Sequence, residues 1–409
     1  MVATLAVIIV FGFAYGKMKL EGVEGFLSGR KTMGVSLGLG TFIAYAAGSG
    51  LLFSPPESGA RLGLPAVIGY GFAIAAPFLV YFTVGPKIRE RMPNGHTIPE
   101  YAKIRFGKPM YALTMVVTLF YMFILMTANL TGVALALKQI AGVPTYLTLI
   151  LVMGAVMIYT IQGGLLSAIF TDLIQAVVII PILVVSILLA VIKLGGPLEM
   201  FTQMQSTAPE FVDMTNPAGV RFAVYIVIAL IGAEMLNQSL WQRAHAAKDS
   251  RTLRVSFVGA AIAVVPMGIL AGLYGVIASG LAMDFVSPSA ALPTVIEATL
   301  GTGAQIAFIV MILLVSHAFG ITQVDIFPSW LVAQFKHHPW HGLRFWDLVH
   351  PFFQFIVGVA MPFSIMKRQS SGQSRLRIFG HVTKRSLLLI FLGVLLLKPE
   401  GLFGRELAE

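Results

Sequence analysis

The stretch that decides the fold is Ala44-Tyr45-Ala46-Ala47-Gly48-Ser49-Gly50, which Ser54-Pro55-Pro56-Glu57-Ser58-Gly59 follows. It lies in an apolar segment, residues 34–56, that is long enough to cross a membrane as a helix. Glycines and small residues make a poor continuous helix, and proline removes a backbone donor. Where a helix breaks inside a membrane, freed carbonyls can bind a cation and half-helix ends can face a solute. Alternatively, the small residues serve close packing and the prolines merely bend the helix.

The composition places this stretch in a membrane protein. Of 409 residues, 57% are hydrophobic and only 11% charged, and the mean hydropathy is +0.86. A soluble core cannot hide that much apolar surface, whereas lipid solvates it. The chain has no cysteine, which excludes disulfides and thiolate metal sites. The net charge of +10 is typical of cytoplasmic loops in a membrane protein, so we expect no nucleic-acid partner.

Hydrophobic segments recur along the chain and predict an all-α integral membrane bundle of about 9–11 transmembrane helices. A first, short span at 2–16 has no basic leader, and the segment 34–56 comes next. Further spans are predicted at 65–85, 110–137, 145–162, 170–194, 220–241, 255–283 and 303–320. Two weaker segments follow near 350–366 and 386–397.

The loops between these segments alternate in charge. Fourteen Lys and Arg residues fall in the segments 17–31, 87–108 and 243–254, whereas the opposite loops and their flanks hold only Arg61, Lys138, Lys193 and Arg221. Because basic loops stay in the cytoplasm, we expect a multi-pass inner-membrane protein whose N-terminus faces outward. The tail breaks this rule, since six basic residues between Lys367 and Arg385 would fall on the outer face.

Two acidic residues stand out within the predicted spans. Glu234 lies in helix 220–241 with Asn237, Gln238 and Trp241; an ionisable residue there is either functional or snorkels and pairs with Arg243. Asp172 lies at the predicted start of a span, where it either caps the helix or helps a cation leave toward the cytoplasm.

The tail also holds a histidine cluster, His337-His338-Pro339-Trp340-His341. An HxxxH spacing can bind a metal on a helix, but Pro339 lies inside it and no carboxylate flanks it. We therefore predict no metal site there. Within the spans we find no pairing of nucleophile and base, no set of metal ligands and no phosphate-binding loop, so we expect no enzymatic activity.

Three segments together resemble the sodium:solute symporter family. They are Gly25-Phe26-Leu27-Ser28-Gly29-Arg30 leading into the helix of Ala44–Gly50; Thr97-Ile98-Pro99-Glu100-Tyr101 with Arg105-Phe106-Gly107; and Gly163-Gly164-Leu165-Leu166-Ser167-Ala168-Ile169-Phe170-Thr171-Asp172-Leu173-Ile174-Gln175. The segment from Gln242 to Asp249 is similar to the family's loop after its sixth core helix. The resemblance covers roughly residues 15–320.

The resemblance implies an inverted five-helix repeat bundle with broken first and sixth core helices. Residues 1–320 would be the transporter core, with 2–16 peripheral, a first repeat at 34–194 and a partial second repeat at 220–320; residues 321–409 are a divergent tail. It also implies Na⁺ as the coupling ion and no other cofactor. The implied Na⁺ ligands are Tyr45, Ala46, Ala47, Gly48 and, by its hydroxyl, Thr322. Asp172 is implied on the cation path. The expected solute contacts are Ser49, Gly50, Glu234, Asn237, Gln238 and Trp241.

Two departures from the family pattern matter. Leu230 and Ala233 stand where sugar-type members have Asn and Tyr, while Trp241-Gln242-Arg243 is closer to urea-type or small-organic-solute members. The eighth core helix should carry several hydroxyls, yet after Val315 only Ser316 and Thr322 remain, and no family pattern continues. A frameshifted or otherwise divergent C-terminus explains this together with the charge conflict.

These observations predict a cation-coupled symporter, with Na⁺ the expected cation, for a small polar organic solute in a lipid bilayer. The alternative is a non-transporting remnant or sensor-like scaffold of a symporter that is disrupted after about residue 315. The solute and the oligomeric state are left open.

Overall fold

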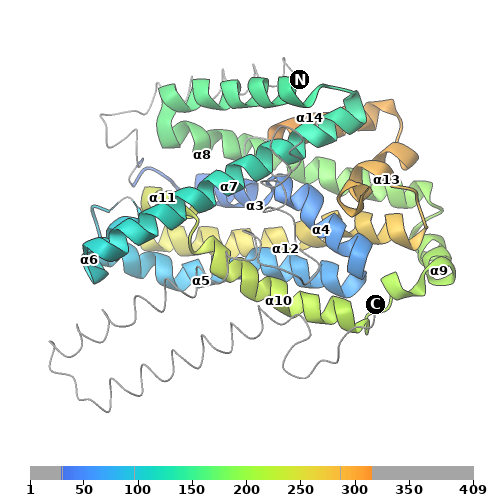
Figure 1. Cartoon of the computed structure of the whole chain (residues 1–409), viewed down its shortest axis with the longest axis horizontal. Coiled ribbons are helices and arrows are strands. Elements are labelled where there is room, and N and C mark those ends of the chain that lie inside the picture. The colour runs from blue at the N-terminus through green and yellow to red at the C-terminus, as the bar shows by residue number, and fades with distance from the viewer. Residues whose placement is uncertain (1–28, 30, 96, 286, 316–409) are drawn as a thin grey trace, which may run out of the picture. The chain divides into compact units, whose positions relative to one another are not determined.

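The structure, a computed structural model, describes residues 29, 31–95, 97–285 and 287–315 (Figure 1). Helices make up nearly all of this part of the chain, and it contains no β-strand. The α-helices are α3 (Val35–Ala46), α4 (Ser49–Leu62), α5 (Leu64–Arg91), α6 (Ile98–Phe106), α7 (Lys108–Ala141), α8 (Thr145–Lys193), α9 (Pro197–Thr207), α10 (Pro217–Glu234), α11 (Gln238–Ala246), α12 (Ser250–Gly280), α13 (Ala291–Thr299) and α14 (Thr302–Val315). Short 3₁₀ turns at Pro209–Phe211 and Pro288–Ala290 complete the set.

The described residues contain five helices that are long and apolar enough to cross a membrane, or six if the bent pair α3 and α4 is one span. These are α5, α7 up to Lys138, the segment Ala168–Lys193 of α8, α10 and α12. The predicted spans 2–16, 350–366 and 386–397 lie outside the described residues.

The first predicted break is confirmed. α3 ends at Ala46 and α4 begins at Ser49, and the two helices meet at an angle of 46°. Gly48 caps α4 with a φ of −55° and a ψ of 174°, values outside the helical region. Pro55 and Pro56 lie inside α4 without ending it. The chain therefore breaks at the glycine, where the backbone turns, and not at the prolines.

The second predicted break is confirmed as well. α10 ends at Glu234 and α11 begins at Gln238, so the predicted span 220–241 is two half-helices. By contrast, the predicted spans 145–162 and 170–194 are joined in one helical run, α8, although Figure 1 shows its ribbon folding back on itself. Asp172 consequently lies within a helix and not at its first turn, so the capping role considered for it is wrong.

The described residues fall into two compact units. The first contains residues up to 95, 121–231 and 237–315, and the second contains 97–120 and 232–236. All the packing below lies within the first unit.

α12 lies at the centre of the first unit, where it packs against α3, α4, α5 and α8. Of the 18 residues in the most apolar stretch of α12, 61% are buried inside the structure, whereas the corresponding share for α10 is 6%. Glycines allow α4 and α12 to approach closely: a Cβ atom on Gly275 would lie 1.8 Å from the Pro56 carbonyl oxygen, and one on Gly59 2.4 Å from that of Gly272. Small residues at such contacts are how helices pack tightly in lipid.

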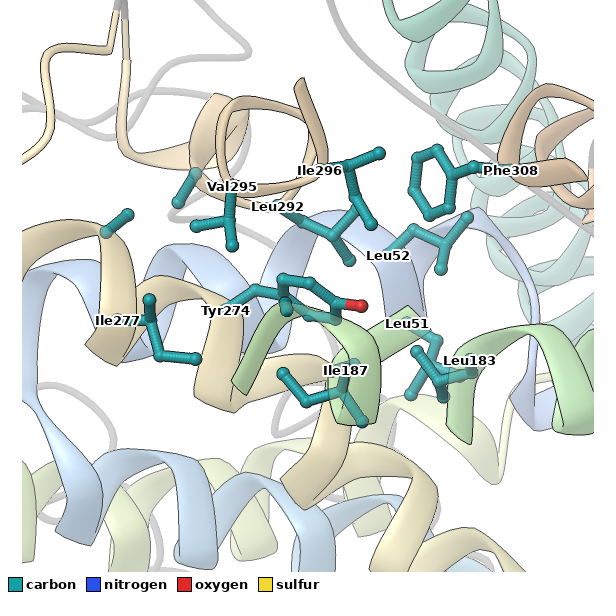
Figure 2. Close-up of a cluster of buried hydrophobic side chains, with 14 of the residues drawn as sticks. Leu51, Leu52, Leu183, Ile187, Tyr274, Ile277, Leu292, Val295, Ile296 and Phe308 are labelled. Carbon is teal, nitrogen blue, oxygen red and sulfur yellow. The ribbon is translucent and has the colours of Figure 1, made fainter. Parts of the chain in front are cut away.

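One apolar cluster joins eight helices, and Figure 2 shows its members from α4, α8, α12, α13 and α14. It includes Leu51 and Leu52 of α4, Leu183 and Ile187 of α8, Tyr274 and Ile277 of α12, Leu292, Val295 and Ile296 of α13, and Phe308 of α14. The Tyr274 hydroxyl in its midst donates to Ser186 Oγ at 2.7 Å, which satisfies a polar group that would otherwise be buried alone. The cluster fixes α13 against the half-helix that follows the first break.

Candidate functional site

The two helix breaks meet through one side-chain hydrogen bond. Tyr45 lies one residue before the end of α3, and Asn237 lies just before α11. Asn237 Nδ2 donates to the Tyr45 hydroxyl at 2.5 Å, and the Asn237 side chain is fully buried. Segments 192 residues apart in sequence are therefore joined where both helices are interrupted.

Asn237 also starts the second half-helix. Its Oδ1 accepts from the backbone N–H of Ser239 at 3.0 Å, a bond of the helix-capping type. One amide thus caps α11 with its oxygen and reaches Tyr45 with its nitrogen. The side chain is held at both ends, so its position is fixed relative to the two breaks.

A buried ionic cluster lies one turn before Tyr45 on α3, at Thr41. Asp172 Oδ2 accepts from Arg243 Nη2 at 2.6 Å and from the Thr41 hydroxyl at 2.5 Å. Arg243 Nε donates to Thr41 Oγ1 at 2.6 Å, and its Nη1 donates to the carbonyl and hydroxyl oxygens of Ser239. The cluster joins α3, α8 and α11.

Burial makes this ion pair important for the structure around it. The side chains of Asp172 and Arg243 are each only 9% exposed. A buried charge without its partner costs several kcal/mol, whereas a well hydrogen-bonded pair roughly balances its own desolvation. Replacing either residue by a neutral one therefore leaves the other charge buried without a counter-charge, which destabilises the folded state.

Gln175, one turn beyond Asp172 on α8, extends the polar surface. It is only 1% exposed, and neither atom of its amide has a hydrogen-bond partner in the described part of the chain. Such groups in a native protein call for an explanation, for example water or an ion. Gln175 is part of the quoted sequence motif, but neither its burial nor its missing partner could be read from it.

The remaining predicted residues are distributed as follows. Ala46 is the last residue of α3, Ala47 is fully buried between the half-helices, and Gly48 with Ser49 begins α4. A Cβ atom on Gly50 would meet no described atom within 4 Å, so no described side chain fills the position beside the start of α4. Gln238 is the first residue of α11.

Two other predicted solute contacts are placed differently. Trp241 is 3% exposed, and its ring packs against Tyr81 of α5 at a centroid distance of 4.6 Å. Glu234 ends α10 and groups with residues 232–236 in the second unit. Thr322 and the histidines between 337 and 341 lie outside the described residues. Among the described residues, no three His, Asp or Glu side chains lie close enough together to hold a metal ion.

The structure also holds an apolar groove that does not include these residues. It has a volume of about 510 Å³ and is lined only by apolar side chains and glycine of α5 and α10 and by Met214, among them Ile68, Phe72 and Val224. It offers a polar solute no hydrogen-bond partner, so the paired breaks are the better candidate site.

Comparison with known proteins finds a membrane transporter family and individual transporters that are similar to this chain. Residues 26–333 match the model of the sodium:solute symporter family. A spermidine transporter of Candida albicans is 25% identical over 261 residues, which are 64% of this chain and 49% of that protein. A urea–proton symporter of Oryza sativa subsp. japonica is 21% identical over 296 residues, 64% of this chain and 41% of the relative. The chain therefore spans about half the length of the curated relatives it matches.

A solved structure shares the fold. A Na⁺-coupled sialic acid symporter in a substrate-bound, outward-open state aligns with a TM-score of 0.66 and 17% identity, over 97% of this chain and 85% of that one. At this identity the likeness supports the fold alone.

The end of the chain matches a second family. Residues 297–401 fit the model described as "Domain of unknown function (DUF5009)". Mouse heparan-alpha-glucosaminide N-acetyltransferase is 40% identical over 70 residues, 17% of this chain and 11% of that enzyme. The expectation that no family pattern continues after Val315 is thus corrected. A frameshift is also disfavoured, because a sequence read out of frame is not expected to match a protein family.

Proposed function

The chain belongs to the sodium:solute symporter family, and we propose that it couples the uptake of a small polar organic solute to the inward flow of Na⁺. The family and the named relatives, which carry urea or spermidine, support solute symport as the general activity. We further propose that the protein spans the cell inner membrane several times with its N-terminus outside, as the charge pattern predicts.

The observation that carries the proposal is the hydrogen bond between Tyr45 and Asn237. It brings two interrupted helices together inside apolar spans, and a helix that ends leaves its last carbonyls without the amides of a following turn. Carbonyl oxygens from Tyr45 to Gly48 are suited to Na⁺, which binds hard oxygen ligands. Thr322 would add a hydroxyl.

The amides of Asn237 and Gln238 and the space beside Gly50, which no described atom fills, suit a compact solute that both donates and accepts hydrogen bonds. Urea, short amines and small amides have this chemistry. Asp172 would attract the cation toward the side that the charge pattern marks as cytoplasmic.

Uptake into proteoliposomes tests the proposal. Labelled urea, spermidine, proline and a short carboxylate are each offered with a Na⁺ gradient, with a proton gradient and with neither. We expect one solute to accumulate only with the Na⁺ gradient, Asp172→Asn to slow that uptake, and Glu234→Gln to change the KM. Accumulation driven only by protons would replace Na⁺ as the coupling ion. No accumulation under any condition would instead favour the non-transporting scaffold.

The variant Asn237→Ala tests whether the solute binds at the two helix breaks. We expect at least a tenfold loss of uptake, since losing a buried amide that bonds at both ends costs about 1–3 kcal/mol. Asn216→Ala is the matched control: the Oδ1 of this asparagine also accepts from a backbone N–H at the start of a helix, that of Ala218 in α10, and its Nδ2 donates to two carbonyls, but it lies outside the site. Equal uptake by the two variants would place the solute elsewhere.

The match to an N-acetyltransferase over 70 residues supports a second candidate function, acyl transfer. Incubating the purified chain with radiolabelled acetyl-coenzyme A and glucosamine tests it. Acetylated sugar that disappears in His337→Ala, His338→Ala or His341→Ala would support it, and no product would dismiss it.

A further inference from the structure

We propose that the predicted cytoplasmic ends of α5 and α12 form a binding surface for one anionic phospholipid of the adjoining leaflet. Arg254, with Arg251 one turn before it, would hold the phosphate, and an apolar stripe beyond them would hold an acyl chain. The surface lies outside the candidate functional site and does not depend on transport. The predicted orientation serves only to name the leaflet.

α5 and α12 lie side by side and run antiparallel (Figure 1). Gly85, near the end of α5, faces Leu253 and Phe257 near the start of α12. Gly71, nearer the start of α5, faces Ile269 further along α12. The end of α5 and the start of α12 therefore meet at one membrane surface, which the charge pattern marks as cytoplasmic.

This end of the helix pair is strongly basic. The segments 87–91 and 248–254 hold six basic residues and two acidic ones: Lys87, Arg89, Arg91, Lys248, Arg251 and Arg254 against Glu90 and Asp249. The carboxylate of Asp249 is engaged, since it accepts from the backbone N–H of Thr252 at 2.6 Å. Within the described part of the chain, the side chains of Arg251 and Arg254 have no ion pair and no hydrogen bond. Their planar N–H donors suit a phosphate group.

An aromatic ring holds Arg254 beside the lipid. Its guanidinium carbon lies 5.8 Å from the centroid of the Phe82 ring of α5, which is within the range of cation–π attraction. Both side chains are exposed. An arginine that extended freely into water would not make this contact, so the guanidinium is kept at the depth where an apolar stem meets a charged head. The contact also means that both helices build the surface.

Beyond the arginines, α12 continues as an exposed apolar stripe. Its members follow one another at intervals of three or four residues, which keeps them on one face of the helix: Val255, Val258 and Ile262. Leu79, one turn before Phe82 on α5, is exposed as well. From Arg254 to Ile262 the helix rises about 12 Å, and one leaflet of hydrocarbon is about 15 Å thick. The surface therefore matches the length of one lipid, with its headgroup at the arginines.

An apolar stripe without the cations would not select an anionic lipid. The span Ala168–Lys193 of α8 is exposed at Val177, but the chain has no Lys or Arg between 139 and 192. Each basic residue near the membrane surface adds about fivefold to the binding of an anionic headgroup. Val177 therefore supplies the control position, where lipid contacts the helix without a cation above it.

A fluorescent reporter measures which lipid lies on the surface. The chain has no cysteine, so Ile262→Cys, at the far end of the stripe, can carry a single bimane label. The purified full-length chain is reconstituted in vesicles of equal parts phosphatidylcholine and phosphatidylglycerol. A nitroxide on the acyl chain of one lipid or of the other quenches the label, and the two quenching curves give the ratio in which the lipids bind.

The expected ratio favours phosphatidylglycerol at one position only. We expect it to be at least about five at Ile262→Cys, as one basic residue near the surface would give, and close to unity at Val177→Cys. Equal ratios at the two positions would mean that ordinary annular lipid covers the stripe, and would overturn the proposal.

Charge variants identify the residues. Arg254→Gln should lower the ratio at Ile262→Cys about fivefold, whereas Arg254→Lys, which keeps the charge, should preserve most of it. Lys193→Gln removes an exposed basic residue at the other end of an apolar span and should leave the ratio unchanged. If Arg254→Gln elutes as an aggregate in gel filtration, Arg251→Gln takes its place with the same expected fall. A ratio that a folded Arg→Gln variant does not change would overturn the site.

Competition decides the source of the phosphate. Glycerol 3-phosphate carries a charged phosphate without acyl chains, and at millimolar concentration it should leave the ratio at Ile262→Cys unchanged. A ratio that it abolishes would show a site for free phosphate compounds, and the lipid assignment would be wrong. High salt should lower the ratio, because it screens exposed charges. A ratio that does not respond to salt would contradict recognition of the headgroup by arginine.

Discussion

At the scale of single residues, the chemistry converges on one oxygen atom. Oδ2 of Asp172 accepts from Thr41 and from two nitrogens of Arg243. The motif in the sequence pointed to Asp172 as a candidate residue, but it did not predict its partner, because Arg243 is 71 residues away in the chain. Thr41 was missed as well, although a hydroxyl in an apolar helix beside the quoted stretch was a usable signal.

We expect Asp172→Asn to lower the melting temperature strongly, because a buried Arg243 without its carboxylate costs about 3–5 kcal/mol. Adding Arg243→Met should recover most of this loss, since an apolar side chain of similar length needs no counter-charge. Thermal unfolding in detergent measures both. A double variant as unstable as the sum of the two single variants would show that the charges do not interact.

At the scale of elements, the breaks were predictable and their surroundings were not. Gly48 and the small residues around it predicted the first interruption, which lies where expected. The prolines predicted a weakness that α4 does not show, because Pro55 and Pro56 are absorbed within its turns. Such tolerance depends on neighbouring helices, which no local pattern records.

The crossing of α4 and α12 gives a stability prediction. Gly275→Ala should lower the melting temperature by the equivalent of at least about 1–3 kcal/mol, because its methyl group would overlap the Pro56 carbonyl oxygen. Gly154→Ala in α8 is the control. No described atom lies within 4 Å of the position of its Cβ, so the same change should be neutral or slightly stabilising. Equal melting temperatures would argue against the crossing.

The cap of α12 gives a pH dependence. The backbone N–H of Thr252, which donates to Asp249 Oδ1 at 2.6 Å, lowers the pKa of this exposed carboxyl. Because the folded-state pKa lies below the unfolded value, the cap contributes fully above that value and is lost as the pH falls through the folded pKa. Between pH 6 and pH 3 the melting temperature of the wild type should fall more than that of Asp249→Asn, which caps without titrating. Parallel curves would contradict this.

At the scale of the whole molecule, the sequence predicted a membrane symporter of the right family, with both half-helix pairs. It did not reveal that residues 297–401 match a second family, since the quoted motifs concerned the first family alone. The six basic residues of the tail contradict the positive-inside rule, and this conflict was the signal in the sequence that the tail departs from the pattern of the first family.

The orientation itself is testable because the chain lacks cysteine. Asn94 and Thr207, the last residue of α9, are both exposed, and they lie in segments between spans that the charge pattern assigns to opposite faces. An impermeant maleimide should label Thr207→Cys on intact cells, and Asn94→Cys only after permeabilisation. The reverse result would invert the topology, and labelling of both on intact cells would refute a fixed orientation.

The central position of α12 has a consequence for biosynthesis. Its partners α3, α4 and α5 end at Arg91, whereas α12 begins only at Ser250. At about 5–20 residues per second, the ribosome needs roughly ten to thirty seconds to reach it. During that interval the glycine-lined faces of the early helices have only lipid, or a chaperone of the insertion machinery, beside them. Nascent chains that stall before α12 should therefore be preferred substrates for membrane proteases, and cellular abundance should respond to α12 variants more than activity does.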